Sequence, residues 1–251
     1  MDKKTGLVAF FDILGYQSFL KHNDPELAAE KISEFVKKVK NFPESVFMKL
    51  FTQDELRKAK ITFVNEIIYL IISDAIILTL EVDNSQPVEA GIRKTYFIVY
   101  CSMLFNELFS FGFPPRAGIE FGDYILFKDQ GSQLFAGKPI IDAYQSAVSL
   151  DLSACRISDS LGIPPIALEN HAYVKYKTPL KTGDEKELKL LMSFYFDVQE
   201  NTYHTISDFT QFVVDSFTAH GKMIDKNVQN KIVNTELFLR YCRAVHLRKT
   251  F

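Results

Sequence analysis

Residues 61–81 read ITFVNEIIYLIISDAIILTLE, and this long apolar run decides the fold. A single strand of this length would extend about 65 to 70 Å, far beyond the usual strand of about five or six residues. The chain must therefore fold back, and the polar break nearest the middle of the run is Ser73-Asp74. Aspartate tolerates the backbone of a tight turn better than most residues. The stretch predicts a β-hairpin with Asp74 at its tip.

A second stretch, AFFDILGY at residues 9–16, places one acid in an otherwise apolar run. Residues 6–12 alternate as in a strand, which separates two faces. One face holds Val8, Phe10 and Asp12, and the other holds Leu7, Ala9 and Phe11. A carboxylate beside a hydrophobic core is costly unless it is protonated, paired with a cation or bound to a metal. Asp12 is therefore a candidate functional residue.

The remaining elements follow from helical spacing and from the Pro and Gly residues that bound them. Helices are expected at about 25–42, 87–112 and 139–152, and strands at 116–127 and 133–136. Two or three further strands are expected between 165 and 196, and two helices between about 206 and 247, split near His220-Gly221. This order predicts an α+β fold in the ferredoxin-like style, with a mostly antiparallel sheet and helices on one face.

The composition is that of an ordinary soluble globular protein, with 47% hydrophobic and 24% charged residues in a chain of 251. The net charge of −2 gives no overall attraction to nucleic acid or to an anionic membrane. Cys101, Cys155 and Cys242 form no zinc-binding spacing, and we expect reduced core cysteines. The most apolar window, 67–80, is too short for a bilayer, which needs about 20 residues. We expect a cytoplasmic protein without membrane or nucleic-acid partners.

Two carboxylates and one arginine form the constellation that suggests chemistry. In the predicted sheet the first strand lies beside the hairpin, so Asp12 can face Asp74. Two facing carboxylates repel unless a cation lies between them, and Mg²⁺ or Mn²⁺ suits oxygen ligands and phosphates. Backbone N–H groups at residues 13–16 could hold phosphate oxygens, and Arg116 could pair with a terminal phosphate. Taken singly, each acid also fits a cap or turn residue, and Arg116 fits a surface arginine.

The same motifs resemble those of the class III nucleotide cyclases over residues 6–157. FFDILGY resembles the first metal-binding motif of that family, SDAIIL the second with Ser73 in place of the usual Gly, and RAGIEFGD the phosphate-side strand. FAGKPIIDAYQSA stands where the family has a Gly followed by its catalytic helix. The resemblance implies a homodimer with active sites at the interface and two divalent ions, Mn²⁺ or Mg²⁺. The catalytic residues it implies are Asp12, Asp74 and Arg116, with metal ligands from Asp12, Ile13 and Asp74. The substrate-binding residues it implies are Phe11, Ile13, Leu14, Gly15, Tyr16, Leu70 and Leu134.

Three departures from the family pattern bear on specificity. Leu70 and Leu134 occupy the positions where purine cyclases carry polar residues that read the base, and neither side chain forms hydrogen bonds. The Asn and Arg pair of the catalytic helix is missing from residues 141–146, which read IDAYQS. Lys138 and Arg156 are the nearby cationic candidates, although Lys138 also fits a solvated helix face.

The stand-alone pyrimidine cyclases of bacterial Pycsar antiphage systems share DILGY and a Gly followed by an Ala-Tyr stretch. Resemblance to them implies conversion of UTP or CTP to a 3′,5′-cyclic nucleotide and pyrophosphate, as an alarm for a separate effector. The expected organisation is a cyclase domain at 1–205, with C-terminal helices at 206–251 that pack on the domain or at the dimer interface. The alternatives are a catalytically inactive cyclase-like domain that binds a nucleotide or a partner, and a purine cyclase.

Overall fold

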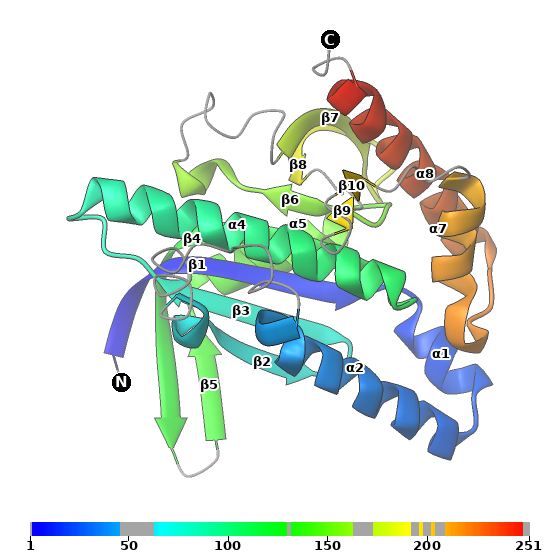
Figure 1. Ribbon diagram of the computed structural model, residues 1–251, viewed down its shortest axis with the longest axis horizontal. Helices are drawn as coiled ribbons and strands as arrows, with labels where there is room; N and C mark the ends of the chain where they lie inside the picture. Colours follow the sequence, from blue (N-terminus) through cyan, green and yellow to red (C-terminus); the bar gives the residue numbers. More distant parts are fainter. Residues whose placement is uncertain are drawn as a thin grey trace.

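The computed structural model describes residues 2–45, 63–129, 132–162, 173–191, 196–197, 202–203 and 209–247 (Figure 1). The strands are β1 (Asp2–Ile13), β2 (Ile68–Ile72), β3 (Ala75–Glu81), β4 (Pro115–Asp129), β5 (Ser132–Ala136), β6 (Cys155–Ile157), β7 (Tyr173–Pro179), β8 (Glu185–Leu191), β9 (Phe196–Asp197) and β10 (Thr202–Tyr203). The helices are α1 (Tyr16–His22), α2 (Pro25–Ser45), α4 (Pro87–Ser110), α5 (Lys138–Ser149), α7 (Phe209–Thr218) and α8 (Lys226–Leu247), with 3₁₀ turns η2 (Asp159–Leu161) and η3 (Ala219–Gly221). Parts of the predicted elements at 61–62, 130–131, 165–172, 192–195 and 206–208 lie outside the described residues.

The main sheet has eight strands in the order β2-β3-β1-β4-β6-β8-β7, with β5 paired to β4. Every described strand pair is antiparallel except β4–β6. The first four strands and their helices follow the β-α-β-β-α-β order expected from the sequence. The predicted fold class, α+β with a mostly antiparallel sheet and a C-terminal helical extension, is confirmed.

The hairpin predicted at the break of the long apolar run is present. β2 and β3 pair antiparallel, and the turn between them consists of Ser73 and Asp74. Ser73 takes a positive φ of 53°, where the family resemblance expects a glycine. Residues 63–66 are helical, so the strand-rich part of the run is shorter than its apolar length.

Helices cover both faces of the sheet, which corrects the expectation of helices on one face. Leu7, Ala9 and Phe11 of β1 belong to the main core, together with residues from α2 and α4. Val8 and Phe10 point to the other face and pack with Ala143 and Ala147 of α5. The physical reason is that β1 is apolar on both faces, so each face needs a covering layer.

Helix α5 approaches β4 closely because Gly118 has no side chain. A Cβ at Gly118 would lie 2.5 Å from the carbonyl oxygen of Ala143 and 2.7 Å from Cβ of Ser146. The chain then forms β6, a short strand that the sequence analysis did not predict and that runs parallel to β4. This connection brings the end of α5 beside the start of β4.

The C-terminal helices pack on the sheet domain, and their split at His220-Gly221 is confirmed. Phe209, Val213 and Phe217 of α7 join the main core, and Phe238 and Cys242 of α8 pack against β7 and β8. In Figure 1 these helices stand at the end of the sheet where β1 stops and α1 begins. All three cysteines are buried and free, as expected. Among the described helices, none combines the length and apolar character needed to cross a bilayer.

Candidate active site

The end of β1 brings Asp12 and Asp74 to neighbouring positions of one ladder. Asp12 pairs with Ala75 of β3, directly after the hairpin turn. The amide of Ile13 donates a hydrogen bond of 2.9 Å to the carbonyl oxygen of Asp74. The juxtaposition expected from the two motifs is therefore present in the fold.

On its other side, Asp12 lies opposite Arg116 of β4, and the two side chains form an ion pair. Nε of Arg116 donates to Oδ2 of Asp12 at 2.5 Å, and Nη1 donates to the carbonyl oxygen of Val148 at 3.0 Å. The side chains of Arg116 and Asp12 are only 10% and 18% exposed, so the pair is largely desolvated. This pair explains how an acid is tolerated in an apolar strand. Contact of Arg116 with a phosphate stays a prediction.

The donor set at this edge fits Mg²⁺ or Mn²⁺ that takes its other ligands from a bound phosphate and water. It consists of two carboxylates, Asp12 and Asp74, and the backbone at Ile13. Within the described residues no group of three or more His, Cys, Asp or Glu side chains could hold a metal alone. Magnesium is commonly held by one or two carboxylates together with substrate phosphates. A divalent ion at this edge would therefore need further oxygen ligands from a bound phosphate or from water.

The predicted phosphate-binding loop at residues 13–16 has fewer free backbone amides than expected. The amide of Ile13 is bonded to Asp74, and the amide of Leu14 donates 2.9 Å to the carbonyl oxygen of Pro114. These two amides are engaged because β1 continues its ladder to both neighbouring strands. The side chains of Phe11, Ile13, Leu14 and Tyr16 are buried in the main core, so they do not line an open site. Of the four backbone amides at residues 13–16, those of Gly15 and Tyr16 have no hydrogen-bond partner among the described residues.

Tyr16 connects the loop after β1 to the hairpin turn. Its hydroxyl takes part in a hydrogen bond with the side chain of Ser73. Burial raises the pKa of Tyr16, the Ser73 hydrogen bond opposes this, and the charge of Asp74 adds to the increase. Tyr16 is therefore a neutral hydroxyl group close to Asp74 at neutral pH.

Lys222 is a buried residue beside the loop that the sequence analysis missed. Gly15 has a φ of +78°, and a Cβ there would lie 3.1 Å from Cδ of Lys222. The ammonium group donates hydrogen bonds to the carbonyl oxygens of Gly112 and Ser216 and lies 5.3 Å from the centre of the Phe113 ring. Lys222 thus ties the C-terminal segment to the two segments that precede α1 and β4. No local pattern marks it, since its partners are distant in the sequence.

Burial lowers the pKa of Lys222 to about 7, which gives a prediction for stability. A lysine in the unfolded chain titrates near pH 10.4, so between about pH 7 and pH 10 only the unfolded chain holds this proton. The contribution of Lys222 to stability should therefore increase as pH rises through this range. We expect the difference in unfolding free energy between wild type and Lys222→Met to shift in favour of wild type, with a slope approaching about 1.4 kcal/mol per pH unit. Urea titrations of both proteins at several pH values measure this, and a difference independent of pH contradicts it.

A second cluster of charges missed by the sequence analysis surrounds the ion pair of Asp12 and Arg116. The amide of Lys181, in the turn between β7 and β8, donates 2.9 Å to the carbonyl oxygen of Ser149 at the end of α5. Burial lowers the pKa of Lys181, and the positive charge of Arg116 adds to this, while Asp12 opposes it. Lys231 of α8 approaches Asp151 at 3.4 Å. In the sequence Lys181 belongs to a solvated connection, and only the tertiary fold brings it here.

Leu70 and Leu134 lie in different parts of the molecule. Leu70 pairs with Ile77, which pairs with Phe10 of β1, so Leu70 is near Asp12 on the α5 face. Leu134 pairs with Phe127, eleven residues beyond Arg116 along β4, which corresponds to about 36 Å. Figure 1 shows β4 and β5 extending as an arm away from the end where α1 lies. One chain alone does not bring Leu134 to the site.

The outer face of α5 carries exposed apolar side chains. Ile141 and Tyr144 are 57% and 47% exposed, and the Tyr144 ring packs edge-on against Phe10 at 5.3 Å. Lys138 forms an ion pair with Asp142 and is largely exposed, in agreement with a solvated helix face. The positions of the missing Asn and Arg pair thus carry no cation on this helix.

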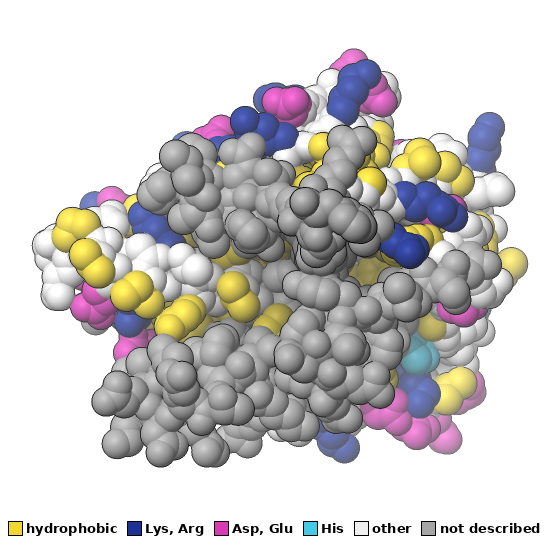
Figure 2. All heavy atoms as spheres, turned by 45° about the horizontal axis from the view of Figure 1, so that its top comes forward, with side chains coloured by type: hydrophobic (Ala, Val, Ile, Leu, Met, Phe, Trp, Pro, Cys, Tyr) yellow, Lys and Arg dark blue, Asp and Glu magenta, His cyan; other side chains and the backbone are white. Residues whose placement is uncertain are grey.

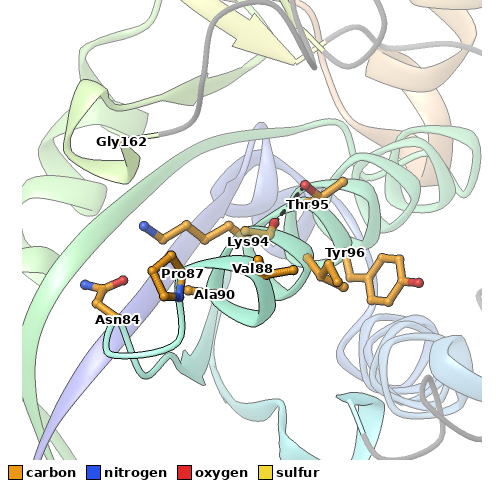
Figure 3. A pocket seen from close by; sticks show the side chains of 10 residues that line it. Asn84, Pro87, Val88, Ala90, Lys94, Thr95, Tyr96 and Gly162 are labelled. Carbon is orange, nitrogen blue, oxygen red and sulfur yellow. Dashed lines mark hydrogen bonds between the residues drawn. The ribbon is translucent and has the colours of Figure 1, made fainter.

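A hollow beside α4 lies on the face of the sheet opposite to the one that carries Asp12. It has a volume of about 780 Å³ and is lined by the first turns of α4, including Val88 and Lys94 (Figure 3). The ammonium group of Lys94 lies 4.4 Å from the centre of the Phe121 ring. Hydrophobic side chains gather on the left of Figure 2. Val88, in the first turn of α4, is 79% exposed. The sheet separates this hollow from Asp12, and none of its described lining residues is an acid.

Comparison with known proteins gives likenesses of structure only. No protein-family model and no curated protein matches the sequence. The guanylate cyclase domain of RhGC from Catenaria anguillulae, solved with GTP, is similar at 12% identity and a TM-score of 0.48, over 76% of this chain and 98% of that one. The adenylyl cyclase CyaB from P. aeruginosa is similar at 13% identity and a TM-score of 0.44, over 75% and 93%. A class III adenylyl cyclase-like ATP-binding protein from Pseudomonas aeruginosa is similar at 12% identity and a TM-score of 0.48, and the likeness covers 96% of this chain and 43% of that one. At these values the likenesses assign neither a family nor an activity to this chain.

Proposed function

We propose that the protein is a nucleotide cyclase that converts a nucleoside triphosphate to its 3′,5′-cyclic monophosphate and pyrophosphate. The observation that carries the proposal is the pairing of β1 with the hairpin, which sets Asp12 beside Asp74, with Arg116 on the other side of Asp12. Two carboxylates and a cation at one strand edge suit metal-assisted phosphoryl transfer. The motifs FFDILGY, SDAIIL and RAGIEFGD, which resemble those of class III cyclases, support the same reaction.

In this proposal Asp12 and Asp74 hold the divalent ions, with the backbone of Ile13 as a further ligand. When bound, the ions supply Lewis-acid activation of the ribose 3′-hydroxyl and neutralise the leaving pyrophosphate. Arg116, which is paired with Asp12, and Lys181, whose charge interacts with both, are the two described cations that we expect to oppose phosphate charge. The 3′-oxygen forms a bond to the α-phosphorus, the bond between the α-phosphorus and the bridging oxygen breaks, and the hydroxyl proton leaves to solvent. The role of the chain is to position these groups in line.

The substrate that we propose is a pyrimidine nucleoside triphosphate, UTP or CTP. This part of the proposal is supported by the side chains at the two base-reading positions, because neither Leu70 nor Leu134 can form a hydrogen bond with a purine edge. The likeness of DILGY and the Ala-Tyr stretch to Pycsar pyrimidine cyclases supports it as well. In that setting the cyclic nucleotide serves as an alarm in antiphage defence, acting on a separate effector that this protein need not bind.

The active form we propose is a homodimer. Leu134 is 52% exposed on an arm that lies far from Asp12 in its own chain. Ile72, Ile141 and Tyr144 add exposed apolar surface on the face that also carries Asp12 and Leu70. A second copy that covers this face could bring its own Leu134 to the site, and large exposed apolar patches commonly mark such contacts.

The second candidate is a domain that binds a nucleotide without turning it over. It is favoured by residues 141–146, where the Asn and Arg pair of the family is missing and where Ile141 is an exposed apolar residue. In this case triphosphate would bind at Asp12 and Asp74 and be recovered unchanged.

A competition assay tests the base preference. Equal concentrations of UTP, CTP, ATP and GTP are incubated with the purified protein and Mn²⁺, and the products are identified by mass spectrometry. We expect cyclic UMP or cyclic CMP to exceed the purine products by at least about tenfold, equivalent to one lost purine hydrogen bond. A purine cyclic nucleotide as the main product would overturn the pyrimidine assignment and leave the cyclase assignment intact. Binding without any cyclic product would favour the second candidate.

A further inference from the structure

A polar pocket lies beside α5, on the side away from β1. It has a volume of about 420 Å³ and opens between α5, β4, β6 and β8. The residues that line it are Glu120, Lys138, Asp142, Gln145, Ser146, Ser149, Arg156, Ser158, Leu180, Lys186 and Leu188. Its volume is in the range of small-molecule sites, and almost all of its lining side chains are polar. Asp12, Asp74 and Arg116 are not among them, whereas Lys138 and Arg156 are the two cations that the sequence analysis named beside the missing Asn and Arg pair.

Arg156 contributes to this pocket a guanidinium group that has no hydrogen-bond or ion-pair partner among the described residues. It lies on β6, opposite Gly118 of β4, and is half-buried. In the part of the chain that the structure describes, no hydrogen bond or ion pair holds its guanidinium, although Asp159 lies close enough for the two charges to interact. The carboxylate of Asp159 is itself bonded to Lys189. A half-buried guanidinium without a partner is suited to bind an anion that enters the pocket.

Lys186 adds a second cation from β8. It lies on the same side of the strand as Leu188, which also lines the pocket, and no described acid pairs with it. Lys138 differs, because its charge is already balanced by Asp142. Among the described lining residues, Arg156 and Lys186 are therefore the two cations available to a ligand.

Glu120 adds a buried acid to the lining of this pocket. The residue is 6% exposed, and its carboxylate accepts hydrogen bonds from the hydroxyls of Ser146 at 3.1 Å and Ser160 at 3.0 Å. Hydroxyl donors therefore already approach this carboxylate, and a ligand hydroxyl would be a chemically similar partner. The charge of Glu120 should weaken the binding of a phosphate alone, so a ligand that presents phosphate to the cations and a hydroxyl group to Glu120 fits the pocket better.

We propose that this pocket binds a phosphorylated sugar, with the phosphate held by Arg156 and Lys186 and a sugar hydroxyl donating to Glu120. The pocket is a separate site from the ion pair of Asp12 and Arg116. Glu120 lies four residues beyond Arg116 on β4, which corresponds to about 13 Å. The proposal does not depend on the cyclase activity.

Calorimetric titration of the full chain in EDTA tests the proposal, because EDTA removes divalent ions and so prevents metal-dependent binding at Asp12 and Asp74. The probes are ribose 5-phosphate and inorganic phosphate. We expect wild type to bind ribose 5-phosphate more tightly than phosphate, and Arg156→Gln and Lys186→Gln to weaken both by about tenfold or more. Lys177→Gln is the matched control, since Lys177 lies on the same hairpin opposite Glu187, on the other side of the strands. It should bind both probes as wild type does.

Glu120→Gln separates the sugar from the phosphate. The change removes the negative charge, so inorganic phosphate should bind as tightly as before or more tightly, whereas the preference for ribose 5-phosphate should fall by about tenfold. Thermal melting of each variant shows that it is folded, and Lys186→Gln, an exposed substitution, decides the matter if Arg156→Gln does not fold. No binding of either probe to wild type, or equal binding by Lys186→Gln and Lys177→Gln, would overturn the proposal.

Discussion

Replacing Asp74 with alanine should abolish formation of the cyclic nucleotide while the protein stays folded. Asp74 supplies one of the two carboxylates at the proposed site, and loss of a single group that stabilises transition-state charge typically lowers the rate by about 10³-fold. The fold should tolerate the change, because the turn uses the backbone carbonyl of Asp74, which accepts from the amide of Ile13. Product formation is measured by chromatography of the reaction mixture, and folding by thermal melting.

The matched control for this variant is Glu89→Ala, which removes an exposed acid from the first turn of α4. It should keep the wild-type rate. We expect the unfolding free energy of Asp74→Ala to lie within about 1 kcal/mol of wild type. An Asp74→Ala protein with the wild-type rate would rule out the role given to the hairpin.

Replacing Arg116 with methionine should destabilise the protein by about 3 kcal/mol, because it leaves Asp12 as an uncompensated charge in a largely buried position. The double variant Asp12→Asn with Arg116→Met removes both charges and should recover much of that loss. Urea titrations of the wild type, the two single variants and the double variant give the coupling free energy between the two side chains. A coupling near zero would show that the ion pair does not hold this edge of the sheet.

The same variants test whether Asp12 binds a cation without any measurement of activity. Adding Mn²⁺ should stabilise Arg116→Met more than wild type, because the metal replaces the lost positive charge beside Asp12. The double variant, which lacks the carboxylate, should gain less from Mn²⁺ than Arg116→Met. Equal responses of all the variants to Mn²⁺ would contradict metal binding at Asp12.

Helices and strands that have a clear local sequence pattern could be predicted from the sequence. The hairpin at Ser73-Asp74 follows from the length of the apolar run, and the boundaries of α4 follow from Pro87 and Gly112. The alternation in β1 separates its two faces correctly. The same alternation contained the information that both faces are apolar, and the covering of the second face by α5 follows from it. β6 could not be found in this way, because a strand of three residues carries no periodic signal.

The neighbours of the candidate site depend on tertiary contacts that no local pattern encodes. The pairing of Arg116 with Asp12 is set by the register of β1 and β4, over a separation of 104 residues. Lys181 and Lys222 reach the site from a hairpin turn and from the C-terminal segment, where each reads as an ordinary solvated lysine. The amides of Ile13 and Leu14 were expected to be open to phosphate, and they are engaged because both neighbouring strands extend to the end of β1.

The measurement that tests the central claim most directly is turnover of each of the four nucleoside triphosphates, incubated singly with purified wild type and Mn²⁺. Mass spectrometry of the products distinguishes a 3′,5′-cyclic monophosphate from unreacted or hydrolysed nucleotide. We predict a cyclic product and an equal amount of pyrophosphate from UTP or CTP, both lost in Asp74→Ala. The absence of a cyclic product from all four triphosphates would contradict the assignment of this protein as a nucleotide cyclase.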